Sequence, residues 1–386
     1  MKILFVEWDS FGRVDIKEAF TAEGHELVFF PFDVKEADLR HDQEIEDRLH
    51  STLRKETPDA VFSIDFFPVI SKVCRRENIR YISWIYDWPH VLLYSATVIF
   101  PCNVIYVFDK EVYQEFRNAG ITTVHYMPLA ANTKRLDAIT ADAVGTPSFA
   151  YDISFVGSLY VEKINVFDKM MSLIPDYAKG YLEGLMASQL KIQGYNFIQD
   201  LLAPVIQDLY RVFPIEITPD GLETLEHHYA QYVINRRITT IERMDLLEAA
   251  ARNHTVDLFT HVKEVEMPNV RNHGSVNYDY KMPLIFKQSK INLNITLRSI
   301  KSGIPLRAMD IMGCGGFLLS NYQNEFLDFF VPGEDFVFYE SKEDLVQKID
   351  YYLLHEEERQ AVARNGHDKV AAAHTYRHRI REMLDL

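Results

Sequence analysis

The segment from Lys290 to Gly316 is the richest in residues that could do chemistry. An apolar run typical of a strand ends near Asn294, and a polar loop containing Gly303 follows it. Pro305 marks the start of a predicted helix, a position where its missing N–H costs little. The N–H groups at a helix start, preceded by a glycine-containing loop, form a ready phosphate site. The residues therefore predict an anion-binding site in this segment.

Three side chains of the same segment extend the predicted site. Arg298 in the loop and Arg307 in the first helical turn carry guanidinium groups, which form charge-assisted hydrogen bonds with phosphate. Asp310 lies three positions after Arg307 and thus on the same helix face. Its carboxylate is an acceptor suited to a ribose diol. The alternative is an ordinary strand, loop and helix in which Arg307 and Asp310 pair with each other.

Asp87 is a second candidate for chemistry, because it follows a predicted strand and precedes an aromatic-rich loop. A carboxylate there is well placed to accept a proton from a substrate hydroxyl. Asp65 and Asp109 also lie at strand ends and compete for this role, and His90 is a rival base. The alternative for Asp87 is a turn ahead of the proline that follows.

The elements that position these residues alternate between strand and helix. Short apolar runs rich in β-formers alternate with helical stretches over roughly the first 140 residues and again after residue 255. This alternation is typical of parallel sheets covered on both faces. We predict an α/β protein with two such domains, 1–145 and 150–365, and a helical insertion at about 161–253.

Two further segments complete the predicted organisation. The small, Pro- and Gly-containing stretch 143–151 is predicted to be a linker. The last 30 residues are predicted to be helical with a break at Gly366, and residues 366–386 to form a C-terminal helix that packs back on the first domain. Sheets of this kind bind ligands outside the carboxyl ends of their strands. We therefore expect the binding edges of the two domains to face each other across one cleft.

Composition excludes several classes of protein. Of 386 residues, 41 are Lys or Arg and 56 Asp or Glu, giving a net charge of −15, which disfavours non-specific nucleic-acid binding. Three cysteines without metal-ligand spacing favour neither disulfides nor zinc, and a reducing cytoplasm fits best. The adjacent His227 and His228 project apart, so no metal site is expected. The longest apolar run, near 98–108, is too short to span a bilayer.

The same residues lie in a longer pattern that resembles a known family. Residues 302–353, SGIPLRAMDIMGCGGFLLSNYQNEFLDFFVPGEDFVFYESKEDLVQKIDYYL, followed by HEEERQAVARNG, resemble group-one glycosyltransferases of the GT-B type, and more closely the CgeB-like family. Shorter matches run through the rest of the chain: SWIYDWPH at 83–90, YVFDKEVYQEF at 106–116, YMPLAAN at 126–132, FVGSLY at 155–160 and ITTIER at 238–243.

The resemblance implies two Rossmann-like, doubly wound domains that transfer a sugar from a nucleotide diphosphate sugar. The donor ribose would be held by Asp310, and the donor phosphates by the loop with Ser302 and Gly303 and by the basic residues nearby. The glycines after the family's helix correspond to Gly315 and Gly316.

Other donor-side roles follow from the same resemblance. The loop with Gly157 and Ser158 would approach the donor phosphates, where glycine permits close backbone approach. The segment from Tyr278 to Lys287 would lie beside the nucleotide base, with Lys287 as a phosphate ligand or as a purely structural lysine. Arg243 would point into the cleft and meet phosphate, or else pair with Glu242 or Asp245 on a solvated face.

One departure from the family bears on the chemistry. Many relatives carry two glutamates eight positions apart, whereas here Ser302 and Asp310 occupy those positions, so a retaining outcome does not carry over. Metal ions are not expected, since GT-B enzymes usually work without one and the chain has no Asp-x-Asp triplet. No cofactor is expected beyond the donor substrate.

These features predict a cytoplasmic glycosyltransferase that modifies a glycan or protein of the cell envelope. Asp87 would be the catalytic carboxylate, and Asp9, Ser10, Gly12 and His90 would line the acceptor side. Two alternatives stay open: a GT-B-type nucleotide-sugar epimerase, and a non-catalytic partner protein in a glycosylation complex.

Overall fold

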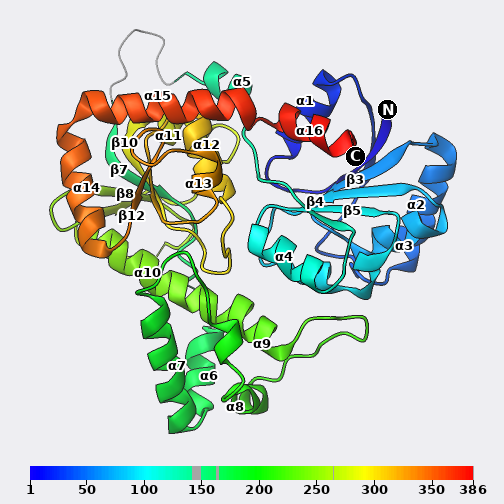
Figure 1. Cartoon of the computed structure of the whole chain (residues 1–386), viewed down its shortest axis with the longest axis horizontal. Coiled ribbons are helices and arrows are strands. Elements are labelled where there is room, and N and C mark those ends of the chain that lie inside the picture. The colour runs from blue at the N-terminus through cyan, green and yellow to red at the C-terminus, as the bar shows by residue number, and fades with distance from the viewer. Residues whose placement is uncertain (141–148, 162–164, 264, 386) are drawn as a thin grey trace. The chain divides into compact units, whose positions relative to one another are not determined.

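A computed structural model describes residues 1–140, 149–161, 165–263 and 265–385. The chain folds into two compact units (Figure 1). Unit 1 comprises 1–129, 216–224 and 375–386, and unit 2 comprises 130–215 and 225–374. Each unit is therefore assembled from stretches that are not contiguous in the sequence.

Unit 1 contains a six-stranded parallel sheet in the order β2-β1-β3-β4-β5-β6. The central strands β1 and β3 are buried almost throughout because their apolar residues face helices on both sides of the sheet. The strands are β1 (Lys2–Glu7), β2 (Glu26–Pro31), β3 (Ala60–Ile64), β4 (Arg80–Trp84), β5 (Asn103–Val107) and β6 (Val124–Tyr126).

Helices of unit 1 follow the strands in the alternation that the sequence predicts. Asp42 caps the second helix by accepting a hydrogen bond from the Ile45 N–H, and Asp109 caps the fourth in the same way. The last helix packs on the first, so the C-terminal stretch of the chain belongs to this unit. The helices are α1 (Arg13–Ala22), α2 (Gln43–Glu56), α3 (Pro68–Arg76), α4 (Lys110–Asn118) and α16 (Tyr376–Leu384).

Unit 2 contains a second six-stranded parallel sheet, in the order β12-β11-β10-β7-β8-β9. The chain builds outward from β7 through β8 to β9 and then returns to place β10 on the other side of β7. The point between β7 and β10 is thus the topological switch point, where ligands of doubly wound sheets bind. The strands are β7 (Tyr151–Val156), β8 (Val256–Phe259), β9 (Val270–Asn272), β10 (Ser289–Asn294), β11 (Leu318–Asn321) and β12 (Val337–Tyr339).

Both faces of this sheet are covered by helices. Ile291 and Leu293 of β10 join a core cluster with residues of α10 and α14, while the intervening Asn292 donates to the Phe286 carbonyl of α11. Since neighbouring residues of a strand point to opposite faces, α10 and α14 lie on one face and α11 on the other. The helices are α5 (Thr133–Ala138), α10 (Asn235–Ala250), α11 (Lys281–Gln288), α12 (Leu306–Gly313), α13 (Phe326–Phe329), α14 (Lys342–Leu354) and α15 (Glu356–Ala373).

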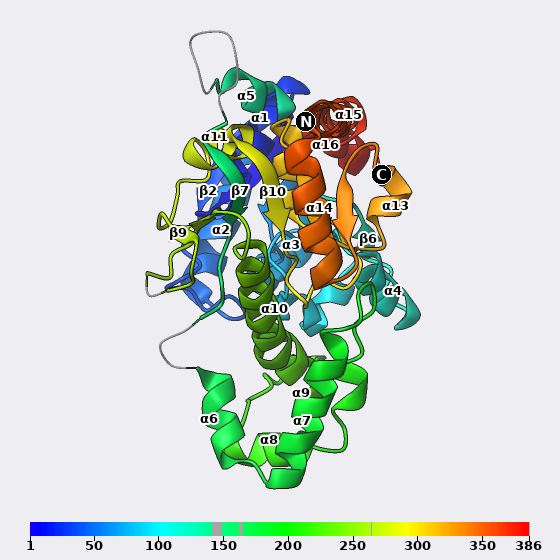
Figure 2. The same cartoon turned by 90° about the vertical axis from the view of Figure 1, so that its left-hand side faces the viewer.

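A helical insertion separates β7 from α10. It has its own apolar core, in which Leu182, Leu202 and Tyr229 are fully buried. Figure 2 shows α10 running from the sheet of unit 2 to these helices. The insertion contains α6 (Val166–Leu173), α7 (Asp176–Gln189), α8 (Ile206–Val212) and α9 (Leu225–His228), and a π-helical stretch Tyr229–Ile234 joins α9 to α10.

The observed boundaries differ from the predicted ones in three places. The first stretch of unit 1 ends at Leu129, not near residue 145, and α5 already belongs to unit 2. Residues 216–224 leave the insertion and join unit 1. The helix break predicted near Gly366 is absent from the described chain, because α15 runs through that glycine. Most of the predicted linker, 143–151, lies outside the described residues.

Candidate active site

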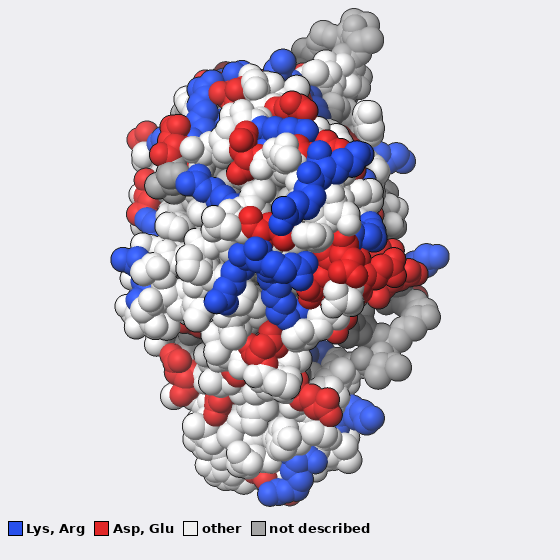
Figure 3. Space-filling view, turned by 90° about the vertical axis from the view of Figure 1, so that its right-hand side faces the viewer, with Lys and Arg blue, Asp and Glu red and all other residues white. Residues whose placement is uncertain are grey.

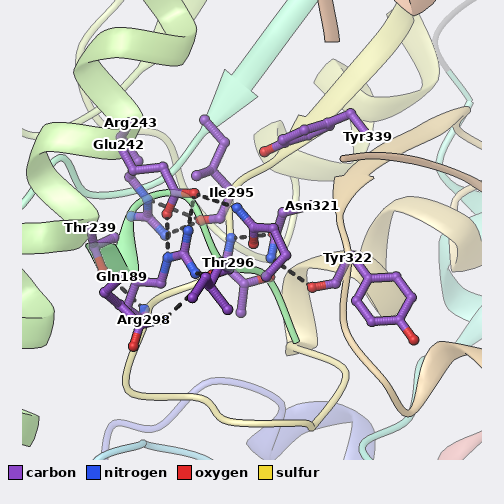
Figure 4. Close-up of polar contacts among 12 residues, drawn as sticks. Gln189, Thr239, Glu242, Arg243, Ile295, Thr296, Arg298, Asn321, Tyr322 and Tyr339 are labelled. Carbon is purple, nitrogen blue, oxygen red and sulfur yellow. Dashed lines mark hydrogen bonds and ion pairs between the residues drawn. The ribbon is translucent and has the colours of Figure 1, made fainter. Parts of the chain in front are cut away.

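The carboxyl ends of β7 and β10 meet around the guanidinium of Arg243. This side chain, on α10, donates from Nε to the Ile295 carbonyl after β10 (3.0 Å) and from Nη1 to the Ser158 carbonyl after β7. It is 8% exposed, and burial lowers the pKa of the guanidinium from its ordinary value. Figure 4 shows Arg243 directed at Ile295. Arg243 thus holds a buried positive charge at the switch point, next to the Gly157–Ser158 loop.

Arg298 lies in the loop after β10, but its guanidinium is engaged inside the protein. Its Nε and Nη2 donate to the two carboxylate oxygens of Glu242 at 2.7 and 2.6 Å, and Nη1 donates to the Ile192 carbonyl at 2.8 Å (Figure 4). Both side chains are nearly buried, at 8% and 7% exposure. Arg298 therefore contributes to the site by fixing the loop against α10, with its donors directed at protein.

The pairing of Arg243 with Glu242 or Asp245, which the sequence leaves open, does not occur in the structure. Glu242 pairs with Arg298, and Asp245 pairs with Lys342 at 3.0 Å. Arg243 is buried, whereas a pairing on a solvated face would leave it exposed.

Helix α12 begins at Leu306, directly after Pro305, as predicted. Asp310 is 5% exposed and its Oδ1 accepts a hydrogen bond from the Tyr278 hydroxyl at 3.0 Å, so the structure brings these two predicted donor residues together. Arg307 donates from Nη1 to the Met282 sulfur, and its guanidinium lies 5.6 Å from the centre of the Phe286 ring. Arg307 therefore lies on the side of α12 that faces α11.

Ser302 and Gly303, in the loop before α12, are tied to the segment after β11. The Ser302 hydroxyl donates to Glu325 Oε1 at 2.6 Å, and the Gly303 carbonyl accepts from Gln323 Nε2 at 3.2 Å. Glu325 is 1% exposed. A carboxylate therefore reaches the Ser302 position in space, although it comes from another part of the chain.

Lys287, Gly315 and Gly316 lie at the amino ends of the strands of this sheet, opposite to the carboxyl ends where Arg243 lies. Lys287 closes α11 just before β10 begins, and the two glycines precede β11, so all three stand at the amino ends of strands. The physical reason is that α12 runs antiparallel to the strands and returns the chain to that edge. The structure thus separates these three residues from Ser158 and Arg243.

In unit 1, Asp87 follows β4 and lies next to Asp65, which follows β3. The buried Asp65 carboxylate accepts hydrogen bonds from the backbone N–H groups of Tyr86 (2.8 Å) and Asp87 (3.1 Å). Burial raises the pKa of Asp65 to about 7. Asp87 itself is exposed, yet desolvation of its carboxyl and the charge of Asp65 raise its pKa to about 6. Such a pKa suits a general base near neutral pH.

The other predicted acceptor-side residues surround the same edge of unit 1. His90 Nε2 lies 2.8 Å from the Phe66 carbonyl and must donate to it, which leaves Nδ1 as the acceptor; burial lowers the His90 pKa. Gly12 caps α1 with φ +74°, and an added Cβ would lie 3.0 Å from the Tyr376 hydroxyl. A glycine is thus required at position 12 by the positive φ of the backbone and by packing within unit 1.

Asp9 and Ser10 complete this set. The Asp9 side chain is 91% exposed and pairs with Arg13, while Ser10 is partly buried in the same loop. Among the described residues, no group of three His, Cys, Asp or Glu side chains is arranged to hold a metal ion. In the same parts of the chain, no helix combines the length and the apolar character that crossing a bilayer requires.

Sequence reasoning missed several residues that shape the site. The sequence predicts Glu242 only as a partner of Arg243, and it predicts no role for Thr239, Asn321 and Glu325. Thr239 accepts from the Arg298 N–H at 2.9 Å, and Asn321 from the Thr296 N–H at 2.8 Å. Polar residues within otherwise apolar stretches mark Glu242, Thr239 and Asn321, which lie on α10 and β11, whereas Glu325 lies outside both elements.

Comparison with known proteins identifies a family for the second part of the chain. Residues 237–385 match the family model described as glycosyl transferase-like, Glyco_trans_1_2. This part of the chain is glycosyl transferase-like. The matched residues include α10 with Arg243, the loop after β10 and α12 with Asp310. The resemblance predicted from sequence is confirmed at family level, and so is the enzyme class. No curated protein matches the sequence.

Solved structures with the same fold include other glycosyltransferases. A glycosyltransferase from Rickettsia africae superposes with a TM-score of 0.53 at 11% identity, covering 100% of this chain and 97% of that one. Sucrose-phosphate synthase from Thermosynechococcus elongatus superposes with a TM-score of 0.53 at 11% identity, covering 100% of this chain and 98% of that one. HepE from Anabaena, in complex with UDP, superposes with a TM-score of 0.55 at 10% identity, covering 100% of both chains. The predicted α/β, GT-B fold is confirmed.

Proposed function

We propose that this glycosyltransferase moves a sugar from a nucleoside diphosphate sugar, bound by unit 2, to a hydroxyl of an acceptor bound by unit 1. The observation that carries the proposal is Arg243, whose buried guanidinium bridges the Ser158 and Ile295 carbonyls at the switch point of the second sheet. A uridine nucleotide is supported by HepE, which has been solved with UDP and with UDP-glucose.

The proposed step transfers the sugar between two oxygens. The bond from the sugar's anomeric carbon to the diphosphate breaks, a bond to the acceptor oxygen forms, and the acceptor proton goes to the Asp87 carboxylate. The departing diphosphate gains negative charge, which a preorganised positive charge stabilises most when water is excluded. Arg243 meets both conditions, since it is buried and its guanidinium is fixed by two carbonyls.

On the donor side, Asp310 would accept hydrogen bonds from the ribose hydroxyls. Tyr278 donates to its Oδ1 and thereby fixes the orientation of the carboxylate. This arrangement supports a role for Tyr278 beside the nucleoside, as the resemblance implies.

The proposal extends to the setting of the reaction. A cell-envelope glycan or protein is the acceptor class that the resemblance supports, and the reaction would run without a metal ion. All three cysteines are unpaired by disulfides, which fits a reducing compartment such as the cytoplasm. On the face shown in Figure 3, Lys and Arg lie beside Asp and Glu. Unit 1 contains ion pairs of this kind, among them Arg54–Glu77 and Arg76–Glu46. Such mixed charge does not suit a nucleic-acid partner.

The donor site is tested by calorimetry with UDP, GDP and dTDP on the wild type and on Asp310→Ala. We expect one of the three nucleotides to bind to the wild type. The variant should bind it at least about tenfold more weakly, because it lacks one strong hydrogen-bonding group. Glu183→Ala, an exposed carboxylate on α7, is the matched control and should bind as the wild type. The assignment fails if none of the nucleotides binds, or if Asp310→Ala binds as tightly as the wild type.

One observation favours a second candidate, a protein that binds the donor without transferring its sugar. Ser302 stands where the family carries its first glutamate, and its hydroxyl is committed to Glu325. Release of UDP from a UDP-sugar distinguishes the candidates. A transferase releases UDP faster when acceptor is added, an epimerase converts the sugar without any acceptor, and a binding protein does neither.

A further inference from the structure

Unit 2 has a pocket at the edge of its sheet opposite to Arg243. The pocket lies where β7, β10 and β11 begin, and one face of α15 also lines it. Its lining residues include Phe149, Ser289 and Phe317. β10 is six residues long, so its two ends are separated by about 20 Å. The pocket is therefore distinct from the candidate donor site at the carboxyl edge.

Arg359 of α15 lines this pocket and has one donor without a hydrogen-bond partner. The side chain is only 2% exposed, and its Nη1 donates to the Tyr352 carbonyl at 2.7 Å. Its Nη2 is buried and has no hydrogen-bond partner among the described residues. The carboxylate of Glu356 is 3.9 Å from Nη2, beyond hydrogen-bond distance, and Glu356 is largely exposed. A buried donor of a charged group left unpaired is costly, so it points to a missing acceptor.

Further cations surround the same pocket. Lys287, Lys290 and Arg364 line it together with Arg359. Two carboxylates offset part of this charge: Asp152 pairs with Lys290 at 2.6 Å, and Glu356 lies near Arg359. Four positive and two negative charges leave a net charge of about +2, which matches a phosphate monoester, a dianion near pH 7.

Aromatic residues complete the lining of the pocket. Phe149, Phe286 and Phe317 line the pocket, and the Arg359 guanidinium lies 5.3 Å from the centre of the Phe149 ring. Gly316 keeps this wall close to the sheet, because a Cβ there would lie 2.8 Å from Asn292 Nδ2. A ligand with an apolar or flat organic part would pack against these rings.

We propose that this pocket is a second ligand site, which binds a small phosphorylated molecule. The phosphate accepts from Arg359 Nη2 and pairs with Lys287 and Arg364, and the organic part packs on Phe286 and Phe317. A guanidinium suits this role because its fork matches phosphate oxygens. The site is separate from the donor site and does not depend on the proposed transferase function.

The test measures binding of phenyl phosphate, inorganic phosphate and benzoate to the full chain by calorimetry at constant ionic strength. We expect phenyl phosphate to bind more tightly than inorganic phosphate, because only the former contacts the rings, and benzoate to bind more weakly than phenyl phosphate. Saturating UDP should leave the phenyl phosphate affinity unchanged within twofold.

Three variants locate the site. Arg359→Lys keeps the charge but loses the guanidinium fork, and Arg364→Gln removes an exposed charge without disturbing packing. We expect losses of at least tenfold and about threefold in phenyl phosphate affinity, respectively. Arg252→Gln, an exposed arginine at the end of α10, is the control and should bind as the wild type. The proposal is overturned if neither phosphate binds, if UDP competes, or if Arg364→Gln binds as tightly as Arg252→Gln.

Discussion

Asp87 combines an exposed position with a carboxyl pKa raised to about 6 by desolvation and by the neighbouring Asp65. The raised pKa makes the carboxylate a stronger base than an ordinary aspartate while leaving it ionised at neutral pH. Asp65 contributes by holding the backbone N–H groups of Tyr86 and Asp87, which fixes the loop that carries the base.

We predict that transferase activity rises with pH through about 6 and then levels. Below that pH the Asp87 carboxyl is protonated and cannot accept the acceptor proton; above it the carboxylate is available. Asp87→Asn should lower kcat/KM by about 10²–10⁴-fold and remove this rise. The measurement is a pH–rate profile from pH 5 to 8.5.

Asp47→Asn, an exposed aspartate on α2, is the matched control and should leave the profile unchanged. A profile for Asp87→Asn with the wild-type shape and height would assign the base elsewhere.

At the scale of residues, the sequence predicts which side chains are present near the site better than it predicts what each one contacts. Tyr278 and Asp310 are both predicted and meet. Arg298 is predicted as a phosphate ligand, but its carboxylate partner Glu242 lies 56 positions earlier. Sequence spacing cannot reveal such a contact, because it depends on how α10 packs against the second sheet.

At the scale of elements, the Arg298–Glu242 pair joins α10 to the loop after β10. Removing one partner of a buried ion pair leaves the other charge uncompensated and lowers the free energy of unfolding by about 3–5 kcal/mol. We expect Arg298→Met or Glu242→Leu alone to lower the free energy of unfolding by about this much. The double variant should lose less than the sum of the two, measured by urea denaturation.

The same helix supplies a control for this comparison of single and double variants. Asp245 and Lys342 form an ion pair that is about half and one-third exposed. Surface pairs contribute about 0–1 kcal/mol, so Lys342→Met should have little effect. Additive losses for Arg298→Met and Glu242→Leu would show that the two side chains are not coupled.

Gly366 explains why α15 continues where the sequence predicts a break. A Cβ at this position would lie 2.3 Å from the Asp335 carbonyl oxygen, so the helix needs glycine to pass the neighbouring backbone. In α7, Gly184 has open space around it. The sequence contains the same residue at both sites, and only tertiary packing distinguishes them.

We predict opposite effects of alanine at these two glycines. Gly366→Ala should destabilise the protein by more than about 1–3 kcal/mol, the usual range for overpacking, because rigid backbone must move. Gly184→Ala should stabilise it by about 0.5–1 kcal/mol through helix propensity. Thermal unfolding of both variants checks this, and equal shifts of the same sign would contradict the packing argument.

At the scale of the whole molecule, the strand and helix alternation predicts both parallel sheets, because strands buried on two faces carry continuous apolar runs. It does not predict that residues 216–224 join unit 1. That segment is fixed by contacts far away in sequence, including Asp220 with Arg40 at 3.1 Å and Ser95 with Asp220 at 2.8 Å.

We predict that turnover does not require a divalent metal. The proposed stabilisation of the leaving diphosphate rests on Arg243, so EDTA should change the rate of UDP release by less than twofold. The measurement compares EDTA-treated enzyme with and without added Mg²⁺ or Mn²⁺. Loss of activity in EDTA that Mn²⁺ restores would assign the charge stabilisation to a metal ion.

The division of the chain between the units has a practical consequence for dissecting this protein. The backbone passes from one unit to the other after residues 129, 215, 224 and 374. A fragment ending near residue 129 would lack α16, which packs on α1, and would expose the apolar face that this helix covers. Neither half can be obtained by a single cut, so isolated halves require a grafted C-terminal helix or co-expression of complementary pieces.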